Sequence, residues 1–306
     1  MFSRCRKRNR VCDSCSCSVD VKTPNERSGF DNCISSLALQ FVTLAILFCT
    51  AGLSYSAERE LRVCADPNNL PFSNQRGEGL ENRIAQLLAR ELKTSVSYVW
   101  WAQRRGFIRN TLAAEQCDVV MGVPSDLPSV LTTRPYYRSR YVFVSRADRN
   151  IVVRSFDDPL LRRLRIGVQV VGDGANTPPM DAFARRDMAR NLVGYTVFGD
   201  YAQPNPPARI VEAVARGEVD IAAVWGPLAG FFAEKFAVPL TLTPVPDDGR
   251  LPFEFAISVA VRKGDEARRA ALDRLLFSKR AEIENILDQY RVPRGSAALS
   301  TSRNGS

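Results

Sequence analysis

Two apolar segments that each end at a proline place the tightest limits on the fold of this chain. Residues 117–124, Cys-Asp-Val-Val-Met-Gly-Val-Pro, are typical of a buried parallel strand that ends in a loop. A similar but weaker pattern occupies residues 214–227, where a helix end and an acidic residue precede an apolar run and Gly-Pro. Between them, a Pro-Tyr-Tyr turn leads into an alternating strand at 141–144. The repeated pattern predicts two α/β lobes that face a cleft.

Hydrophobic spacing predicts the elements around these two segments. For the first lobe we expect strands at 61–65 and 96–101 and helices at 78–92 and 107–114. For the second lobe we expect strands at 164–169, 193–198 and 219–225 and helices at 177–189 and 210–215. Because crossover connections are right-handed, both βαβαβ units predict parallel sheets with their loops at one edge.

The remaining apolar runs predict how the two lobes are joined. Residues 140–145 and 253–261 are interpreted as two crossing strands, and helices at 265–277 and 279–289 are expected to pack back on the first lobe. Lobe 1 therefore comprises 58–145 and 250–294, and lobe 2 comprises 146–249. Residues 295–306 have the composition of a disordered tail.

The N-terminal region predicts export from the cytoplasm. Residues 32–57 carry no charge, the stretch 37–48 is strongly apolar, and small residues at 54 and 56 precede a charged segment. This pattern is typical of a secretory signal peptide cleaved near 56–57, which places the mature protein in the periplasm. An uncleaved membrane anchor is the alternative, although the apolar core is short for a span of about 20 residues.

Residues 1–33 are too long for an ordinary signal-peptide start and hold five cysteines. The Cys12-x-x-Cys15 spacing suggests zinc, but no second pair with suitable spacing follows and the chain contains no His. We therefore expect no metal site and prefer the hypothesis that translation starts later. Residues 1–57 are accordingly interpreted as a non-native preface plus a signal peptide.

Composition excludes several function classes. The absence of His removes a Ser-His-Asp triad and a Cys-His pair. The net charge of +9 over 306 residues comes without a basic run, so nucleic-acid binding is not predicted. A protein partner with an acidic surface is compatible with this charge.

Six ordered blocks carry a resemblance to a known family. They are Arg-Val-Cys-Ala-Asp-Pro-Asn-Asn-Leu-Pro-Phe-Ser (62–73), Trp-Trp-Ala-Gln-Arg-Arg-Gly-Phe (100–107), Cys-Asp-Val-Val-Met-Gly-Val-Pro (117–124), Leu-Thr-Thr-Arg-Pro-Tyr-Tyr-Arg-Ser (131–139), Ala-Asn-Thr-Pro-Pro (175–179) and Val-Trp-Gly-Pro-Leu-Ala-Gly (224–230). Over about residues 59–293 the chain resembles the MoxJ/XoxJ family. These are proteins of the type II periplasmic binding protein superfamily, encoded with quinoprotein methanol dehydrogenases.

The resemblance implies a non-catalytic accessory protein that touches a quinoprotein methanol dehydrogenase or, as a second candidate, its cytochrome c. The dehydrogenase, and not this chain, would then hold pyrroloquinoline quinone (PQQ) and a metal ion. Two alternatives stay open. One is the solute-binding component of an ABC transporter for a small ligand other than an amino acid. The other is a dehydratase that uses carboxylates such as Asp66, Glu78 or Asp173.

The cleft lacks the charged groups by which amino-acid binders of this superfamily hold their ligands. Asp126 stands about where those proteins have an Arg for the ligand carboxylate, and no acid follows the strand that ends at Trp225. Packing and capping are the alternative roles of the cleft candidates. These candidates are Asn68, Asn69, Phe72, Trp101, Gln103, Arg104, Tyr136, Asp173, Asn176, Thr177 and Trp225.

Aromatic and Arg side chains near one end of lobe 1 form a candidate partner face, because these residue types dominate binding hot spots. The candidates are Phe72, Trp101, Arg104, Arg105, Arg134, Tyr137, Arg138 and Arg140. Core packing is the alternative for about half of them.

A disulfide between Cys64 and Cys117 suits an oxidising compartment. An offset of three residues between neighbouring strands, roughly 10 Å, argues against it, since the limit for Cα atoms is about 7 Å.

Overall fold

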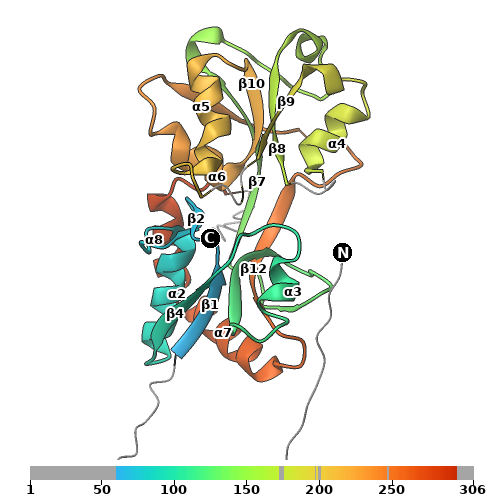
Figure 1. Ribbon diagram of the computed structural model, residues 1–306. Coiled ribbons are helices and arrows are strands. Elements are labelled where there is room, and N and C mark those ends of the chain that lie inside the picture. The colour runs from blue at the N-terminus through green and yellow to red at the C-terminus, as the bar shows by residue number, and fades with distance from the viewer. Residues whose placement is uncertain (1–59, 172–175, 197, 199–200, 247, 295–306) are drawn as a thin grey trace, which may run out of the picture. The chain divides into compact units, whose positions relative to one another are not determined.

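The computed structural model describes residues 60–171, 176–196, 198, 201–246 and 248–294 (Figure 1). The predicted signal peptide, the cysteine-rich preface, the C-terminal tail and Asp173 lie outside these described residues. No helix within the described ranges is long and apolar enough to cross a membrane.

A parallel three-stranded unit forms the first half of the sheet. Strand β1 (Glu60–Ala65) lies between β4 (Ser95–Trp100) and β5 (Val119–Pro124) and pairs in parallel with both. The associated elements are β2 (Asn68–Asn69), β3 (Ser73–Asn74), β6 (Leu131–Thr132), α2 (Leu80–Glu91) and α3 (Phe107–Asn110). The expected βαβαβ order is present, and the second helix is shorter than predicted because the chain turns after Asn110.

A second parallel unit follows later in the chain, with β8 between β9 and β10. Its elements are β8 (Ile166–Val170), α4 (Pro178–Ala184), β9 (Leu192–Thr196), α5 (Arg209–Arg216), β10 (Ile221–Trp225), α6 (Gly226–Ala233) and β11 (Leu240–Pro244). Short 3-10 helices span Ala147–Arg149, Pro159–Arg163, Ala189–Asn191 and Pro206–Ala208.

Helix α6 was not predicted from the sequence, which gave only a Gly-Pro after the strand. The helix begins directly at Gly226, with Pro227 in its first turn. Proline is well tolerated there, because a first-turn N–H has no acceptor within the helix. The Gly-Pro that follows the strand therefore starts a helix.

Two long strands join the parallel units, as expected for a type II periplasmic binding protein. Strand β7 (Tyr137–Arg146) pairs through residues 137–140 with β12 (Glu254–Val261) and lies beside it in Figure 1. From Tyr141 onward, β7 pairs instead with β10 and β11. Tyr141 thus stands where one strand passes from one unit to the other.

The two C-terminal helices pack on the first unit, which confirms their predicted place. Helices α7 (Glu266–Ser278) and α8 (Arg280–Gln289) bury Leu272 and Leu287 in one cluster with Leu61 of β1 and other apolar residues. Each such leucine contributes about 1.5–3 kcal/mol relative to an exposed position. The second unit has its own clusters around Val224 and Phe183.

Cys64 and Cys117 form a disulfide with their Cα atoms 5.6 Å apart. The Cα separation of roughly 10 Å expected from the strand offset is wrong, because β1 and β5 pair only from Val63–Val119 onward. Cys117 lies before the start of β5, so the straight-strand spacing does not apply to it. Both cysteines are buried in a small apolar cluster with Phe107 and Leu112.

Candidate functional site

A cavity of about 240 Å³ opens at the ends of β5, β8 and β10 and beside the crossing strands. Ligands of open α/β sheets bind at such carboxyl ends. The volume is below the range of about 300–1,000 Å³ for drug-sized ligands. The cavity is lined by Asn69, Phe72, Gly122, Pro124, Tyr141, Gln169, Val171, Thr177, Phe198, Trp225, Leu228, Phe255 and Ile257.

Aromatic rings dominate one wall of this cavity. The ring centroids of Tyr141 and Trp225 are 5.3 Å apart, and Phe255 lies 5.9 Å from Trp225 and 6.4 Å from Tyr141. All three contacts are edge-to-face, the arrangement that aromatic quadrupoles favour. The antiparallel pairing of β7 with β10 and β12 places the three residues beside one another.

The polar side chains of the wall bond to the protein itself. Asn69 Nδ2 donates to Gln103 Oε1 at 2.9 Å, Gln169 Oε1 accepts from the Trp225 N–H at 2.8 Å, and Thr177 Oγ1 donates to the Gln169 carbonyl at 3.1 Å. No charged residue is among the described residues that line the cavity. The described wall therefore offers no positive charge to a ligand carboxylate.

The two described carboxylates considered for a dehydratase, Asp66 and Glu78, bond to neighbouring loop residues. Asp66 is 1% exposed, and its two oxygens accept from the N–H groups of Asn68 and Gln103, so it fixes two loops together. Burial raises its pKa. Glu78 is exposed, and its pKa is lowered by hydrogen bonds from Arg76 and Asn74. Neither residue lines the cavity, and Asp173 lies outside the described residues.

Four of the predicted cleft residues line the cavity: Asn69, Phe72, Thr177 and Trp225. The others lie elsewhere. Gln103 accepts a hydrogen bond from Asn69, Asn68 donates to the Gln203 carbonyl, and Asn176 donates to Asp181. Tyr136 packs against the lobe 1 core, and Trp101 and Arg104 are exposed. None of these residues lines the cavity. Their position in the cleft stays a prediction, since Asn68 of the first lobe bonds to a residue of the second.

Sequence reasoning missed most of the aromatic wall. Tyr141 and Phe255 were interpreted only as parts of crossing strands. Their sequence signal was that of buried strand residues, and their place in the wall depends on the pairing of β7 with β10 and β12. Other residues that were missed are Gly122, Pro124, Gln169, Val171, Phe198, Leu228 and Ile257.

The residues of the predicted partner face differ in exposure. Trp101 is 43% exposed, and Arg104 and Arg105 are exposed beside it. Tyr137, by contrast, is 7% exposed and belongs to the core, so its inclusion was wrong.

The remaining candidates have different neighbours. Phe72 lines the cavity, Arg134 lies over the Phe277 ring, Arg138 is near Glu254, and the half-buried Arg140 donates to the Val245 carbonyl. The loop 101–105 keeps the exposed aromatic and basic character that was predicted, and so does Arg134 with the exposed Phe277 ring beside it.

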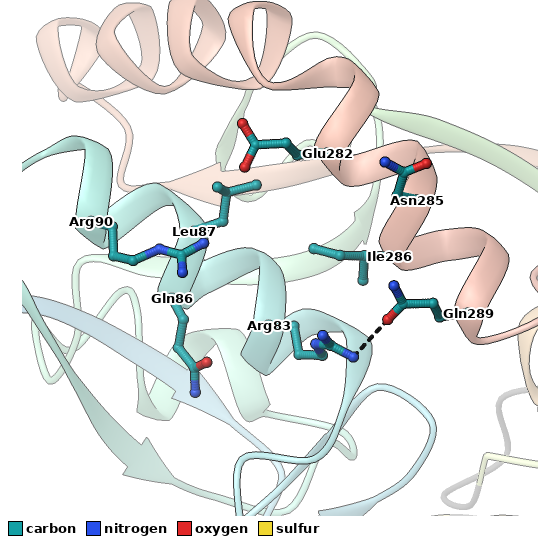
Figure 2. A pocket seen from close by; sticks show the side chains of 8 residues that line it. All are labelled: Arg83, Gln86, Leu87, Arg90, Glu282, Asn285, Ile286 and Gln289. Carbon is teal, nitrogen blue, oxygen red and sulfur yellow. Dashed lines mark hydrogen bonds between the residues drawn. The ribbon is translucent and has the colours of Figure 1, made fainter.

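A second hollow, of about 280 Å³, lies between α2 and α8 (Figure 2). Arg83 and Arg90 of α2 face Glu282 and Gln289 of α8, and Arg83 donates to Gln289 at 2.7 Å. Exposed polar side chains form most of its lining. Because the lining of this hollow is mostly polar, the apolar cavity is the better candidate for ligand binding.

Known proteins with a similar sequence or structure identify the family of this chain. Protein MoxJ of Methylorubrum extorquens is 36% identical over 248 residues, which cover 76% of this chain and 81% of that protein. The chain belongs to the MoxJ family. The crystal structure of MxaJ from Methlophaga aminisulfidivorans MPT matches with a TM-score of 0.67 and 27% identity, covering 77% of this chain and all of that one.

Two further solved structures are similar to this chain, one in sequence and fold and one in fold alone. The periplasmic binding protein XoxJ from Methylobacterium extorquens AM1 matches with a TM-score of 0.64 and 33% identity, covering 77% of this chain and 99% of its own. The substrate binding protein of an amino acid ABC transporter, 19% identical with a TM-score of 0.54, shares the type II fold alone and covers 76% of this chain and 99% of its own. No family model matches the chain.

Proposed function

We propose that this member of the MoxJ family is a non-catalytic periplasmic accessory protein of a PQQ-dependent methanol dehydrogenase and acts by contact with that enzyme. The observation that carries the proposal is family membership, at 36% identity to MoxJ over most of both chains. The contact would activate, mature or stabilise the dehydrogenase, which would hold PQQ and its metal ion.

The loop 101–105 gives this contact a physical basis. Trp101 presents a large aromatic surface to solvent beside the exposed Arg104 and Arg105. Aromatic and Arg side chains are enriched among residues that dominate binding energy. An acidic partner surface would be attracted by the two guanidinium groups, and the attraction would weaken as salt screens it.

Charge reversal of the loop is expected to weaken the complex. For Arg104→Glu/Arg105→Glu we expect at least a tenfold rise in the Kd for the dehydrogenase encoded beside this protein, measured at low salt by calorimetry. The matched control is Arg154→Glu/Arg190→Glu, which makes the same change of net charge at two exposed positions in the second parallel unit.

The wild-type Kd should also rise with salt, and the control variant should bind like the wild type. Absence of a complex at low salt, together with unchanged dehydrogenase activity in a deletion strain, would exclude the accessory role. Equal weakening by both variants would show a net-charge effect and not a contact through the loop.

The solute-binding alternative is favoured by one observation, the apolar cavity between the two parallel units. Among its described lining residues there is no cation for a carboxylate. We therefore expect no amino acid to bind with a micromolar Kd at neutral pH. Calorimetry against a panel of amino acids measures this, and one micromolar ligand would restore the transport function.

A further inference from the structure

A buried carboxyl group lies directly behind the cavity wall. Glu81 is in the first turn of α2 and is 7% exposed, and its N–H donates to the Phe72 carbonyl at 2.9 Å. A Cβ atom on Gly122 would stand only 1.8 Å from Glu81 Oε1, so the carboxyl group fills the space that a side chain would take there. Phe72 and Gly122 both line the cavity. One stretch of glycine backbone therefore separates the carboxyl group from the cavity.

This carboxyl group has no counter-charge among the described residues. No ion pair joins it to an Arg or a Lys in the described ranges, and its side chain makes no hydrogen bond there. The titratable groups that face it are the phenols of Tyr98, Tyr136 and Tyr137, whose pKa values burial raises further above neutrality. An isolated buried carboxylate is costly unless a cation or a proton compensates it.

The cavity beside Glu81 is suited to a cation that carries apolar groups. Its wall holds the rings of Tyr141, Trp225 and Phe255, and aromatic faces attract organic cations, especially quaternary ammonium groups. Low polarity in the wall strengthens the attraction between a bound cation and Glu81. A volume of about 240 Å³ limits the ligand to a small molecule.

We propose that the cavity binds a small organic cation, with the Glu81 carboxylate as its counter-ion and the aromatic wall as its apolar contact. This goes beyond the accessory function and does not depend on it. A zwitterionic amino acid is disfavoured by the same geometry, because its carboxylate would meet Glu81 and an uncharged wall.

Binding of such a cation is linked to a proton. Burial raises the pKa of Glu81 to about 8, so the group is mostly protonated at pH 7. A cation that pairs with the carboxylate must displace that proton. We expect choline binding to release close to one proton per site at pH 7, and the affinity to be about tenfold higher at pH 9 than at pH 7.

The test compares choline with its uncharged isostere 3,3-dimethylbutan-1-ol by calorimetry on the purified protein. At pH 9 we expect choline to bind at least tenfold more tightly, and we expect this preference to disappear in Glu81→Gln. Proton release is measured from the binding enthalpy in buffers of different ionisation enthalpy and should vanish in the same variant.

Glu78→Gln, which removes an exposed carboxylate of the neighbouring loop, is the matched control and should bind like the wild type. Equal affinity for the two probes, no binding of choline at pH 9, or an unchanged preference in Glu81→Gln would each overturn the proposal. The comparison of the two probes on the wild-type protein decides the question even without the variant.

Discussion

Replacement of both Cys64 and Cys117 by alanine is expected to lower the free energy of unfolding by about 2–4 kcal/mol. The bond closes a loop across a sequence separation of 53 and so restricts the unfolded chain strongly. Both sulfurs are buried with Phe107 and Leu112, and their loss also leaves a small cavity. Urea unfolding monitored by fluorescence measures the change.

The reduced wild-type protein is the matched control for this variant, because it keeps the sulfur atoms and loses only the covalent bond. Its midpoint should lie close to that of the double variant and well below that of the oxidised protein. Coincident urea midpoints for the oxidised and reduced wild type would contradict the prediction, as would two alkylated thiols in the unreduced, denatured protein.

The order of elements could be predicted from the sequence because apolar periodicity and buried strands leave a strong signal. The strands at Glu60–Ala65 and Glu254–Val261 lie within a residue or two of their expected positions. Strand register could not be predicted, since it depends on pairing between distant segments. The three-residue offset expected for the two cysteines agrees with the observed register, in which Cys64 is opposite Val120. The expected separation was wrong for another reason, because it assumed that Cys117 lies within a straight strand.

The cavity was less predictable than the fold. Loop residues at strand ends were expected to line it, and Asn69, Phe72, Thr177 and Trp225 do. The aromatic wall and the buried carboxyl group were missed because their positions depend on tertiary contacts. Glu81 in particular occupies an ordinary first-turn position for an acid, and nothing local marks it as buried.

Glycine at position 122 is the link between fold and site. Its φ of 69° lies in the left-handed region, where other residues are strained. The same residue leaves the space that the Glu81 carboxyl group fills. The Met-Gly-Val-Pro sequence, interpreted only as a strand end, therefore also leaves room for a carboxyl group beside the cavity.

Glu81→Gln is expected to be more stable than the wild type at pH 8 and nearly equal to it at pH 5. The folded pKa of about 8 lies above the ordinary value of 4.5. Between these values the folded protein retains a proton that the unfolded chain has lost, so the free energy of unfolding falls as pH rises. From pH 5 to pH 8 the wild type should lose about 3–4 kcal/mol more than the variant does.

The position of Glu81 in the first turn of α2 works in the opposite direction but does not change this sign. A helix N-terminus favours a carboxylate by about 0.3–1 kcal/mol at exposed positions, which is smaller than the effect of burial. Urea unfolding of both proteins at constant ionic strength, from pH 5 to pH 8, isolates the contribution of Glu81 because other titrating groups cancel in the difference.

Glu78→Gln is again the matched control. The pKa of Glu78 is lowered by Arg76, so the stability that this group contributes is lost as pH falls through its folded pKa, below the window that is measured. Its difference from the wild type should therefore stay constant between pH 5 and pH 8. A constant difference for Glu81→Gln as well would show that the Glu81 carboxyl group is ionised in the folded protein at pH 5, and hence that burial does not hold it protonated behind the cavity.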